Sequence, residues 1–142
     1  MKQIFIILFL VLFSTLAYAT FETFDQLLEK ANAGDVSAQV SLAGRYAHGR
    51  GVPQNYKEAA KWYRMAAEQG HTEAQYYLGV MYYDGKGVKA DYVEAYKWIS
   101  LAGMNGKNVD RLKSLLQNLM TTAQITEAQL LVENYIARGG EQ

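Results

Sequence analysis

Residues 35–70 read DVSAQVSLAGRYAHGRGVPQNYKEAAKWYRMAAEQG, and residues 71–106 read HTEAQYYLGVMYYDGKGVKADYVEAYKWISLAGMNG. The two stretches align without a gap, and 14 of the 36 positions carry the same residue. In the first copy these are Ala38, Gln39, Leu42, Tyr46, Gly49, Gly51, Val52, Tyr56, Glu58, Ala59, Lys61, Trp62, Ala66 and Gly70. A fixed period of about 20 to 50 residues is typical of proteins that stack copies of one structural unit.

The first half of each unit predicts a helix that ends at a glycine. In the first copy Ala38, Leu42 and Tyr46 are spaced four residues apart, which places them on one face of a helix. Gly49 then ends the helix, because glycine readily adopts the left-handed backbone conformation of a helix C-terminus. Gly51 permits a tight connection to the next element.

The second half of each unit predicts a second helix. Asn55 and Glu58 have the spacing of a capping box, which marks a helix start. Ala59, Trp62 and Ala66 follow at spacings of three and four and form an apolar stripe. One helix hairpin cannot bury its stripe alone, so neighbouring units must cover it. The sequence therefore predicts an all-α fold, a short α/α superhelical solenoid of helix hairpins.

The segments on either side of the two repeats predict terminal caps. Residues 20–34 are expected to form an N-terminal capping helix, equivalent to half a repeat, with its helix from Phe24 to Ala33. Residues 107–142 are expected to form divergent C-terminal capping helices, which brings the expected total to about seven helices. The inward residues expected there are Val109, Leu112, Leu115, Leu116 and Leu119 on the first helix and Ile125, Ala128, Leu131, Val132 and Tyr135 on the second.

Residues 1–19 have the pattern of a signal peptide. Lys2 precedes the apolar run from Ile4 to Phe13, and Ala17 and Ala19 supply small residues at the third and first positions before a cut. We expect cleavage after Ala19 and an exported chain, located in the periplasm or secreted. The alternative is an uncleaved membrane anchor, but the run is shorter than the roughly 20 residues of a spanning helix. No second long apolar run follows, so no stable membrane insertion is expected after cleavage.

Composition excludes several classes of protein. The 142 residues have a formal net charge of +0 and contain no cysteine. A disulfide scaffold, a zinc–thiolate site and a cysteine nucleophile are therefore excluded. A nucleic-acid partner is not expected, because the chain has no net positive charge to attract phosphates.

The repeated pattern resembles the Sel1-like repeat, a relative of the tetratricopeptide repeat. The resemblance rests on Ala-x3-Leu-x3-Tyr-x2-Gly-x-Gly-Val at residues 38–52 and on Tyr-x-Glu-Ala-x2-Trp at residues 56–62, and on the copies of both. Tetratricopeptide repeats rank second, because their usual period is about 34 residues and they lack the Gly-x-Gly-Val connection. The resemblance implies an α/α superhelix that serves as a protein-interaction module, often in exported bacterial proteins, without a conserved catalytic residue.

The expected function is a non-enzymatic adaptor or scaffold of the bacterial envelope or secreted space that binds a protein partner through the concave face of the repeats. Two alternatives remain open, a hydrolase related to cell-wall or β-lactam chemistry and a self-associating structural protein. Some cysteine-rich Sel1-like proteins have been described as β-lactamases, but this chain has neither cysteines nor a Ser-x-x-Lys motif. His48 and His71 lack the spacing of a metal pair. We expect no catalytic residue, no metal and no cofactor.

Residues that differ between the units are the candidates for partner contact. Ser41, Arg45, Tyr77 and Met81 each lie one position before a residue of the first-helix stripe. Tyrosine, methionine and arginine are enriched at protein interfaces. We therefore expect these four residues to form one partner-facing patch, the alternative being that they pack against the neighbouring unit or face solvent. Trp62 and Trp98 are expected in the core, and Lys57, Lys61, Arg64 and Lys97 on a solvated outer face.

Overall fold

The computed structural model describes residues 23–140, and every regular element among them is a helix. The seven helices are α2 (Phe24–Asn32), α3 (Val36–His48), α4 (Tyr56–Glu68), α5 (Thr72–Asp84), α6 (Tyr92–Met104), α7 (Asp110–Leu119) and α8 (Thr122–Ala137). The expected all-α fold is confirmed. The proposed signal peptide at residues 1–19 lies outside the described residues.

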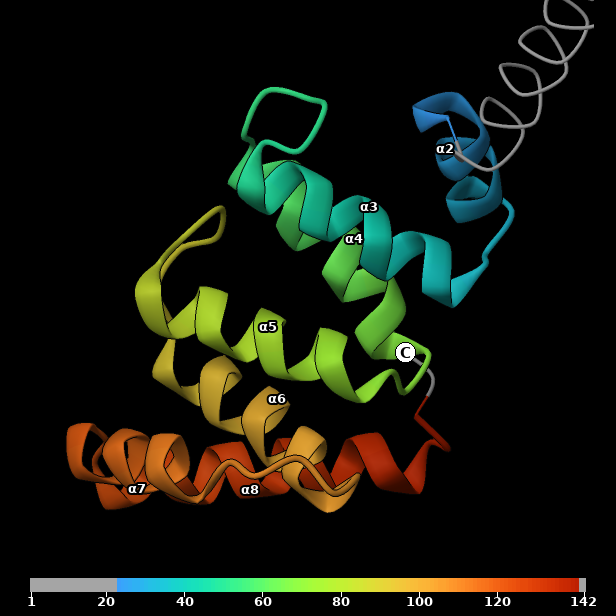
Figure 1. Ribbon diagram of the computed structural model, residues 1–142. Coiled ribbons are helices and arrows are strands. Elements are labelled where there is room, and N and C mark those ends of the chain that lie inside the picture. Colours follow the sequence, from blue (N-terminus) through green and yellow to red (C-terminus); the bar gives the residue numbers. More distant parts are fainter. Residues whose placement is uncertain (1–22, 141–142) are drawn as a thin grey trace, which may run out of the picture.

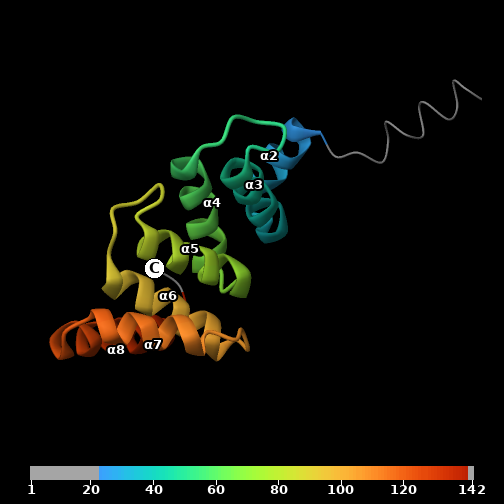
Figure 2. The same cartoon turned by 60° about the vertical axis from the view of Figure 1, so that its left-hand side comes forward.

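From α2 to α7, helices adjacent in the chain pack against one another, so this part of the fold is an array of helix hairpins, and α8 packs on α6. α3 packs on α4, α4 on α5, and α5 on α6, while α2 covers α3 at the start. Figures 1 and 2 show the helices following one another from α2 at one end of the molecule to α7 and α8 at the other. This arrangement is the helical solenoid that the repeat predicts.

The helix ends follow the sequence signals with one correction. Gly49 and Gly85 end α3 and α5 in the left-handed conformation, with φ of 66° and 68°. The Asn55 side chain accepts hydrogen bonds from the backbone N–H groups of Lys57 and Glu58 at 3.0 and 3.2 Å. The expected capping box does not close, because the backbone N–H of Asn55 already donates to the carbonyl of Tyr46 at 2.9 Å.

The core contains the expected alanine, leucine and tryptophan positions. Leu42, Leu78 and Trp98 are fully buried, and Trp62 is nearly so. The Trp98 indole N–H donates to the Glu94 carboxylate at 3.0 Å.

Two basic residues depart from the expected outer face. Arg64 is half-buried and donates a hydrogen bond to the Tyr82 hydroxyl of α5, and Lys97 is buried. Lys97 is only 4% exposed, its ammonium lies 3.5 Å from the Glu94 carboxylate, and it lies 4.5 Å from the centre of the Trp98 ring. The reason is that α6 is covered by α7 and α8 as well as by α5, whereas α4 packs on α3 and α5. Lys61, the equivalent residue of α4, stays exposed.

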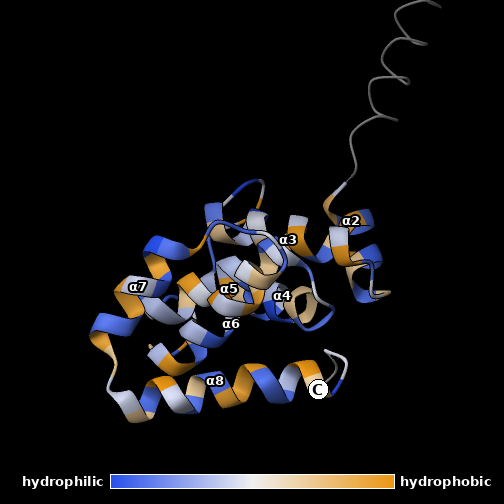
Figure 3. Cartoon of the chain, turned by 90° about the horizontal axis from the view of Figure 1, so that it is seen from below, coloured by the Kyte–Doolittle hydropathy of each residue, from blue (hydrophilic) through white to orange (hydrophobic). Residues whose placement is uncertain are grey.

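The last helix bridges the two repeats. α8 packs on α6, and Figure 3 shows it running along one edge of the molecule with hydrophobic and hydrophilic residues mixed along it. Ala128, Val132 and Tyr135 are buried, as expected. The Tyr135 hydroxyl donates to the backbone carbonyls of Ala67 and Glu68, both at 3.1 Å. The end of α8 is therefore tied to the end of α4 in the first repeat.

The apolar face expected on α7 is only half correct. Leu116 is fully buried, but Leu115 and Leu119 are exposed. The apolar stripe of α7 is wider than the surface that the neighbouring helices cover, so one edge of it remains open to solvent.

Candidate functional site

A run of tyrosine rings crosses from the first repeat to the second. The ring of Tyr63, on α4, stacks on the ring of Tyr77, on α5, with centres 5.3 Å apart and planes at 28°. Tyr76 meets Tyr77 edge-on at 5.6 Å. Tyr77 is 42% exposed, although its ring is held by two neighbours. These three residues are called the tyrosine run below, and they expose the ring of Tyr77, part of Tyr76 and almost none of Tyr63.

An apolar groove continues from the tyrosine run towards the end of the array. It lies between α5 and α7 and encloses about 340 Å³. Its walls are Tyr76, Val80 and Tyr83 on α5, and Val109, Leu112 and Leu115 on the α7 side. Asp84, Asn108 and Arg111 complete its rim. α5 is the first helix of the second unit, and α7 is the first helix after that unit. The α5/α7 groove therefore lies on the side of the array formed by the first helices.

Both carboxylates beside the groove are paired with lysines. The Lys107 ammonium lies 2.6 Å from the Glu73 carboxylate and 4.9 Å from the centre of the Tyr76 ring. Lys86 lies 3.0 Å from the Asp84 carboxylate. The pKa of Lys107 is raised mainly by its hydrogen bond to Glu73, and the pKa of Lys86 by its hydrogen bond to Asp84. Both lysines therefore keep their charge, and both carboxylates are neutralised.

Tyr63 differs from the other rings in its electrostatic surroundings. Burial raises the pKa of Tyr63 to about 12, the neighbouring Tyr77 contributes in the same direction, and the Arg50 guanidinium opposes them. The phenol is therefore protonated at every physiological pH. Its oxygen faces Gly44 of α3, where the Cβ of an alanine would lie 3.8 Å away. The ring thus reaches α3 as well as α5.

The four residues expected to form one patch have different surroundings. Ser41 is exposed, Arg45 is half-buried, and Tyr77 belongs to the tyrosine run. Met81 is 7% exposed and lies in the core, so for this residue the packing alternative is correct. Tyr77 lies one position before a residue of the buried stripe of α5, and its ring stacks on Tyr63 of α4. This position of a first helix therefore faces the second helix of the preceding unit.

Most of the groove was missed by reasoning from the sequence. Tyr76 and Val80 lie two positions before the stripe residues Leu78 and Tyr82, where the first copy has Val40 and Gly44. The available signal was that each position carries a larger side chain in the second copy, Tyr76 in place of Val40 and Val80 in place of Gly44. A second signal was that the apolar stripe of the predicted helix containing Leu115 is wider than a single buried face requires.

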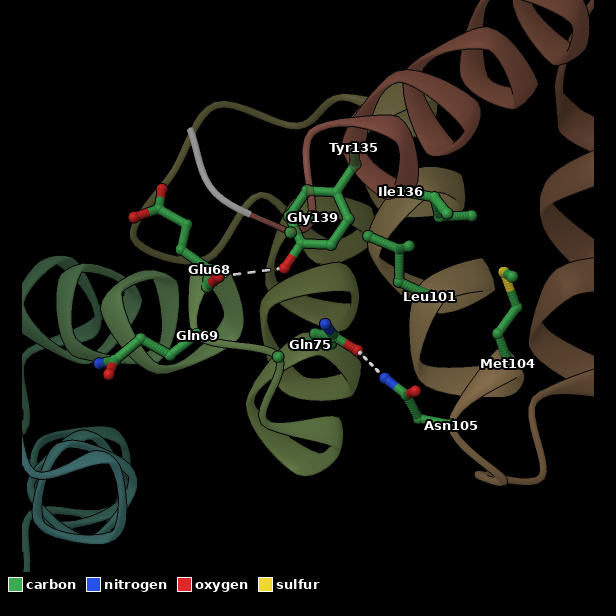
Figure 4. A pocket seen from close by; sticks show the side chains of 11 residues that line it. Glu68, Gln69, Gln75, Leu101, Met104, Asn105, Tyr135, Ile136 and Gly139 are labelled. Atoms are coloured by element: carbon green, nitrogen blue, oxygen red, sulfur yellow. Dashed lines mark hydrogen bonds between the residues drawn. The ribbon is translucent and has the colours of Figure 1, made fainter.

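A second concavity lies where the ends of α4, α6 and α8 meet. It encloses about 470 Å³. Figure 4 shows Leu101, Met104 and Ile136 on one side, and the Gln75–Asn105 and Tyr135–Glu68 hydrogen bonds beside them. Its polar atoms are used to join helices, since Asn105 donates to Gln75 at 3.1 Å and Tyr135 donates to Glu68. This concavity therefore serves the packing of α8.

Two titratable side chains, His71 and Asp91, are used as helix caps. His71 caps α5, with its ring nitrogen 3.4 Å from the backbone nitrogen of Ala74. Asp91 caps α6 by accepting from Val93 and Glu94. Within residues 23–140, no group of three or more metal-ligating side chains is close enough to hold an ion. None of the described helices is long and apolar enough to cross a membrane.

Comparison with known proteins decides the family. The Sel1 repeat model matches residues 36–71 and 72–107, two adjacent copies that together cover half of the chain. The chain belongs to the Sel1 repeat family. Sel1 repeats commonly serve as protein–protein interaction modules, and the fold is a scaffold for such interactions. No curated protein matches the chain.

Two solved structures place this Sel1 repeat protein among its structural relatives. A protective antigen of uropathogenic Escherichia coli strains with an SLR fold has 36% identity and a TM-score of 0.75, over 80% of this chain and 25% of that chain. A Sel1 repeat protein from Oxalobacter formigenes has 37% identity and a TM-score of 0.62, over 65% of this chain and 27% of that chain. The Sel1 repeat protein thus spans about a quarter of the length of both solved chains.

Proposed function

We propose that this Sel1 repeat protein is a non-catalytic adaptor that binds a protein partner through the tyrosine run and the α5/α7 groove. The observation that carries the proposal is the groove itself, an open apolar channel between two first helices, lined by the half-buried rings of Tyr76 and Tyr83 and by the exposed Leu115. Tyrosine and arginine are the residue types that most often dominate protein interfaces. The groove lies on the side of the first helices, which line the concave face in stacked hairpins.

The location of this activity is part of the same proposal. The pattern of residues 1–19 favours export, so we place the chain in the periplasm or the secreted space and expect its partner there. Sequencing the N-terminus of the purified natural protein tests the location. A chain that begins at Thr20 supports export, and a chain that retains Met1 contradicts it.

The test of binding uses two matched leucines. Leu115 in the groove is 41% exposed, and Leu130 on α8 is 54% exposed, so either can be replaced by glutamate without burying a charge. Each variant is tagged at the C-terminus, crosslinked in its native compartment and captured, and the captured proteins are identified by mass spectrometry. Helicity is measured in parallel by circular dichroism.

We expect Leu115→Glu to lose one or a few proteins that both the unmodified chain and Leu130→Glu retain. Helicity should be unchanged in both variants, because both side chains already face solvent. The same captured set from all three baits would contradict the proposal. Loss of helicity in Leu115→Glu alone would mean that the groove is needed for folding, and would also count against it.

A second candidate function, self-association, is favoured by exposed apolar side chains on the last two helices. Leu119, Leu130 and Ile136 are all exposed there. A mass that rises with concentration in sedimentation equilibrium would support this candidate. A monomer over the whole range would remove it.

A further inference from the structure

The α5/α7 groove carries an unbalanced positive charge. Asp84 and Arg111 are the charged residues on its rim. Asp84 is already paired with Lys86 at 3.0 Å, whereas Arg111 makes no hydrogen bond or ion pair with any residue in the described part of the chain. Glu73, which lies beside Tyr76, is likewise neutralised by Lys107. The guanidinium of Arg111 is therefore the charge that a bound partner would meet.

Arg111 thus stands at the rim of an aromatic and aliphatic channel. This positive character is local, because the whole chain has a formal net charge of +0.

From this arrangement we infer that the partner presents an acidic segment with an apolar anchor, the anchor side chain entering the α5/α7 groove and a carboxylate facing Arg111. The inference rests on the proposed function and specifies the chemistry of the same surface. An arginine guanidinium binds a carboxylate in a bidentate manner, which fixes the direction of the bound segment. Aliphatic or aromatic side chains complement the walls formed by Tyr76, Val80 and Leu115.

Arg111 is a favourable position for a charge-reversal test. It lies in the first turn of α7 and its side chain is exposed. An acidic residue near a helix N-terminus interacts favourably with the helix dipole, so Arg111→Glu should not weaken the fold. Lys89→Glu is the matched control, because Lys89 is exposed and lines a different depression, together with Arg64 and Glu94.

The experiment is a selection of random twelve-residue peptides displayed on phage against the chain without residues 1–19. One enriched peptide is then synthesised, together with a version in which its acidic residues are lysines. Affinities for the unmodified chain, Arg111→Glu, Lys89→Glu and Leu115→Glu are measured by fluorescence anisotropy at two salt concentrations.

We expect the enriched peptides to combine aspartate or glutamate with an aliphatic or aromatic residue. Arg111→Glu should lower the affinity for the acidic peptide about tenfold. The same variant should bind the lysine version of the peptide more tightly than the unmodified chain does. Lys89→Glu should leave the affinities for both peptides unchanged. Higher salt should lower the affinity of the unmodified chain for the acidic peptide.

Each contrary result has a separate meaning. Enriched peptides without acidic bias that still lose binding in Leu115→Glu would overturn the acidic inference and leave the proposed function standing. Peptides that bind all four chains equally would overturn both the inference and the groove as the binding surface. A selection that enriches no sequence would also contradict both.

Discussion

At the scale of single residues, a buried glutamine joins three helices at the same position of each repeat. The Gln75 side-chain amide donates to the Ala67 carbonyl at 3.2 Å and accepts from Asn105 at 3.1 Å. Gln39 does the same with Ala31 and Gln69, at 3.2 and 2.9 Å. The glutamine is one of the identical positions of the repeat, and its hydrogen bonds link the end of one second helix to the next unit.

Replacing this glutamine should destabilise the protein. Gln75→Ala removes both hydrogen bonds and leaves a cavity, so we expect a loss of about 1–3 kcal/mol in the free energy of unfolding. Urea denaturation followed by circular dichroism measures the loss. Gln129→Ala is the control, because Gln129 is exposed on α8. Equal stability of the two variants would contradict the structural role of Gln75.

Tyr63 gives a prediction for alkaline pH. Its pKa is raised from 10.0 to about 12 in the folded protein, so the folded state holds its proton more tightly than the unfolded state. The stabilisation is fully present below pH 10 and is lost as the pH rises towards 12. Its size is of the order of 2 kcal/mol.

The measurement compares the pH dependence of stability in the unmodified chain and in Tyr63→Phe between about pH 9 and pH 12. The stability of the unmodified chain should fall more steeply with rising pH, because phenylalanine has no proton to lose. Parallel curves would mean that Tyr63 ionises as it does in the unfolded chain.

At the scale of the elements, the two Gly-x-Gly connections have the same backbone but different neighbours. Gly51 and Gly87 have φ of 75° and 73°. A Cβ at Gly87 would overlap the backbone carbonyl of Tyr56, whereas one at Gly51 would meet nothing within 4 Å. The second connection is therefore pressed against the start of α4, and the first is open.

Replacing each of these two glycines with alanine should distinguish the cost of backbone strain from the cost of close packing. Gly51→Ala should cost about 1 kcal/mol, the cost of the left-handed conformation alone. Gly87→Ala should cost about 3 kcal/mol, because the connection must also move away from α4. Thermal unfolding of the two variants measures the difference. Equal costs would mean that the connection moves freely.

The period of the sequence was enough to predict the helices but not which side of each helix stays open. Ala38, Leu42 and Tyr46 locate the buried stripe of a first helix without a neighbour being known. Whether the adjacent position packs or faces a partner depends on where the preceding second helix lies. For that reason Met81 was expected on the surface and is in the core, while the exposed face containing Tyr76 was missed.

The terminal elements show the same limit. Leu115 and Leu119 belong to an apolar stripe that predicts burial, but none of the described helices covers them. Lys97 shows the reverse, since its repeat position predicts exposure and the packing of α7 and α8 on α6 leaves it buried. Contacts outside the repeat period cannot be predicted from the period itself.

At the scale of the whole molecule, Tyr135 ties the last helix to the first repeat. Its hydrogen bonds to Ala67 and Glu68 connect residues 68 and 67 positions apart in sequence. Tyr135→Phe keeps the ring packed on Trp98 and removes only the hydroxyl. We expect a loss of about 1 kcal/mol and faster amide hydrogen exchange at the end of α8.

The exchange pattern distinguishes a local effect from a general one. Exchange in α3 should be unchanged, since α3 packs mainly on α2 and α4 and α8 packs mainly on α6. Faster exchange throughout the chain would mean that α8 supports the entire array. Unchanged exchange in α8 would mean that apolar packing alone holds its end in place.

Binding of a partner along the tyrosine run and the α5/α7 groove can be tested by site-specific photocrosslinking. The most direct measurement replaces Tyr77 with the photocrosslinking residue p-benzoylphenylalanine and irradiates the chain in its native compartment. Tyr56 serves as the matched control, since it is 37% exposed and Tyr77 is 42% exposed. We expect a discrete adduct with another protein from position 77 that position 56 does not form and that Leu115→Glu abolishes. An adduct from position 56 alone, or none from position 77, would contradict this proposal.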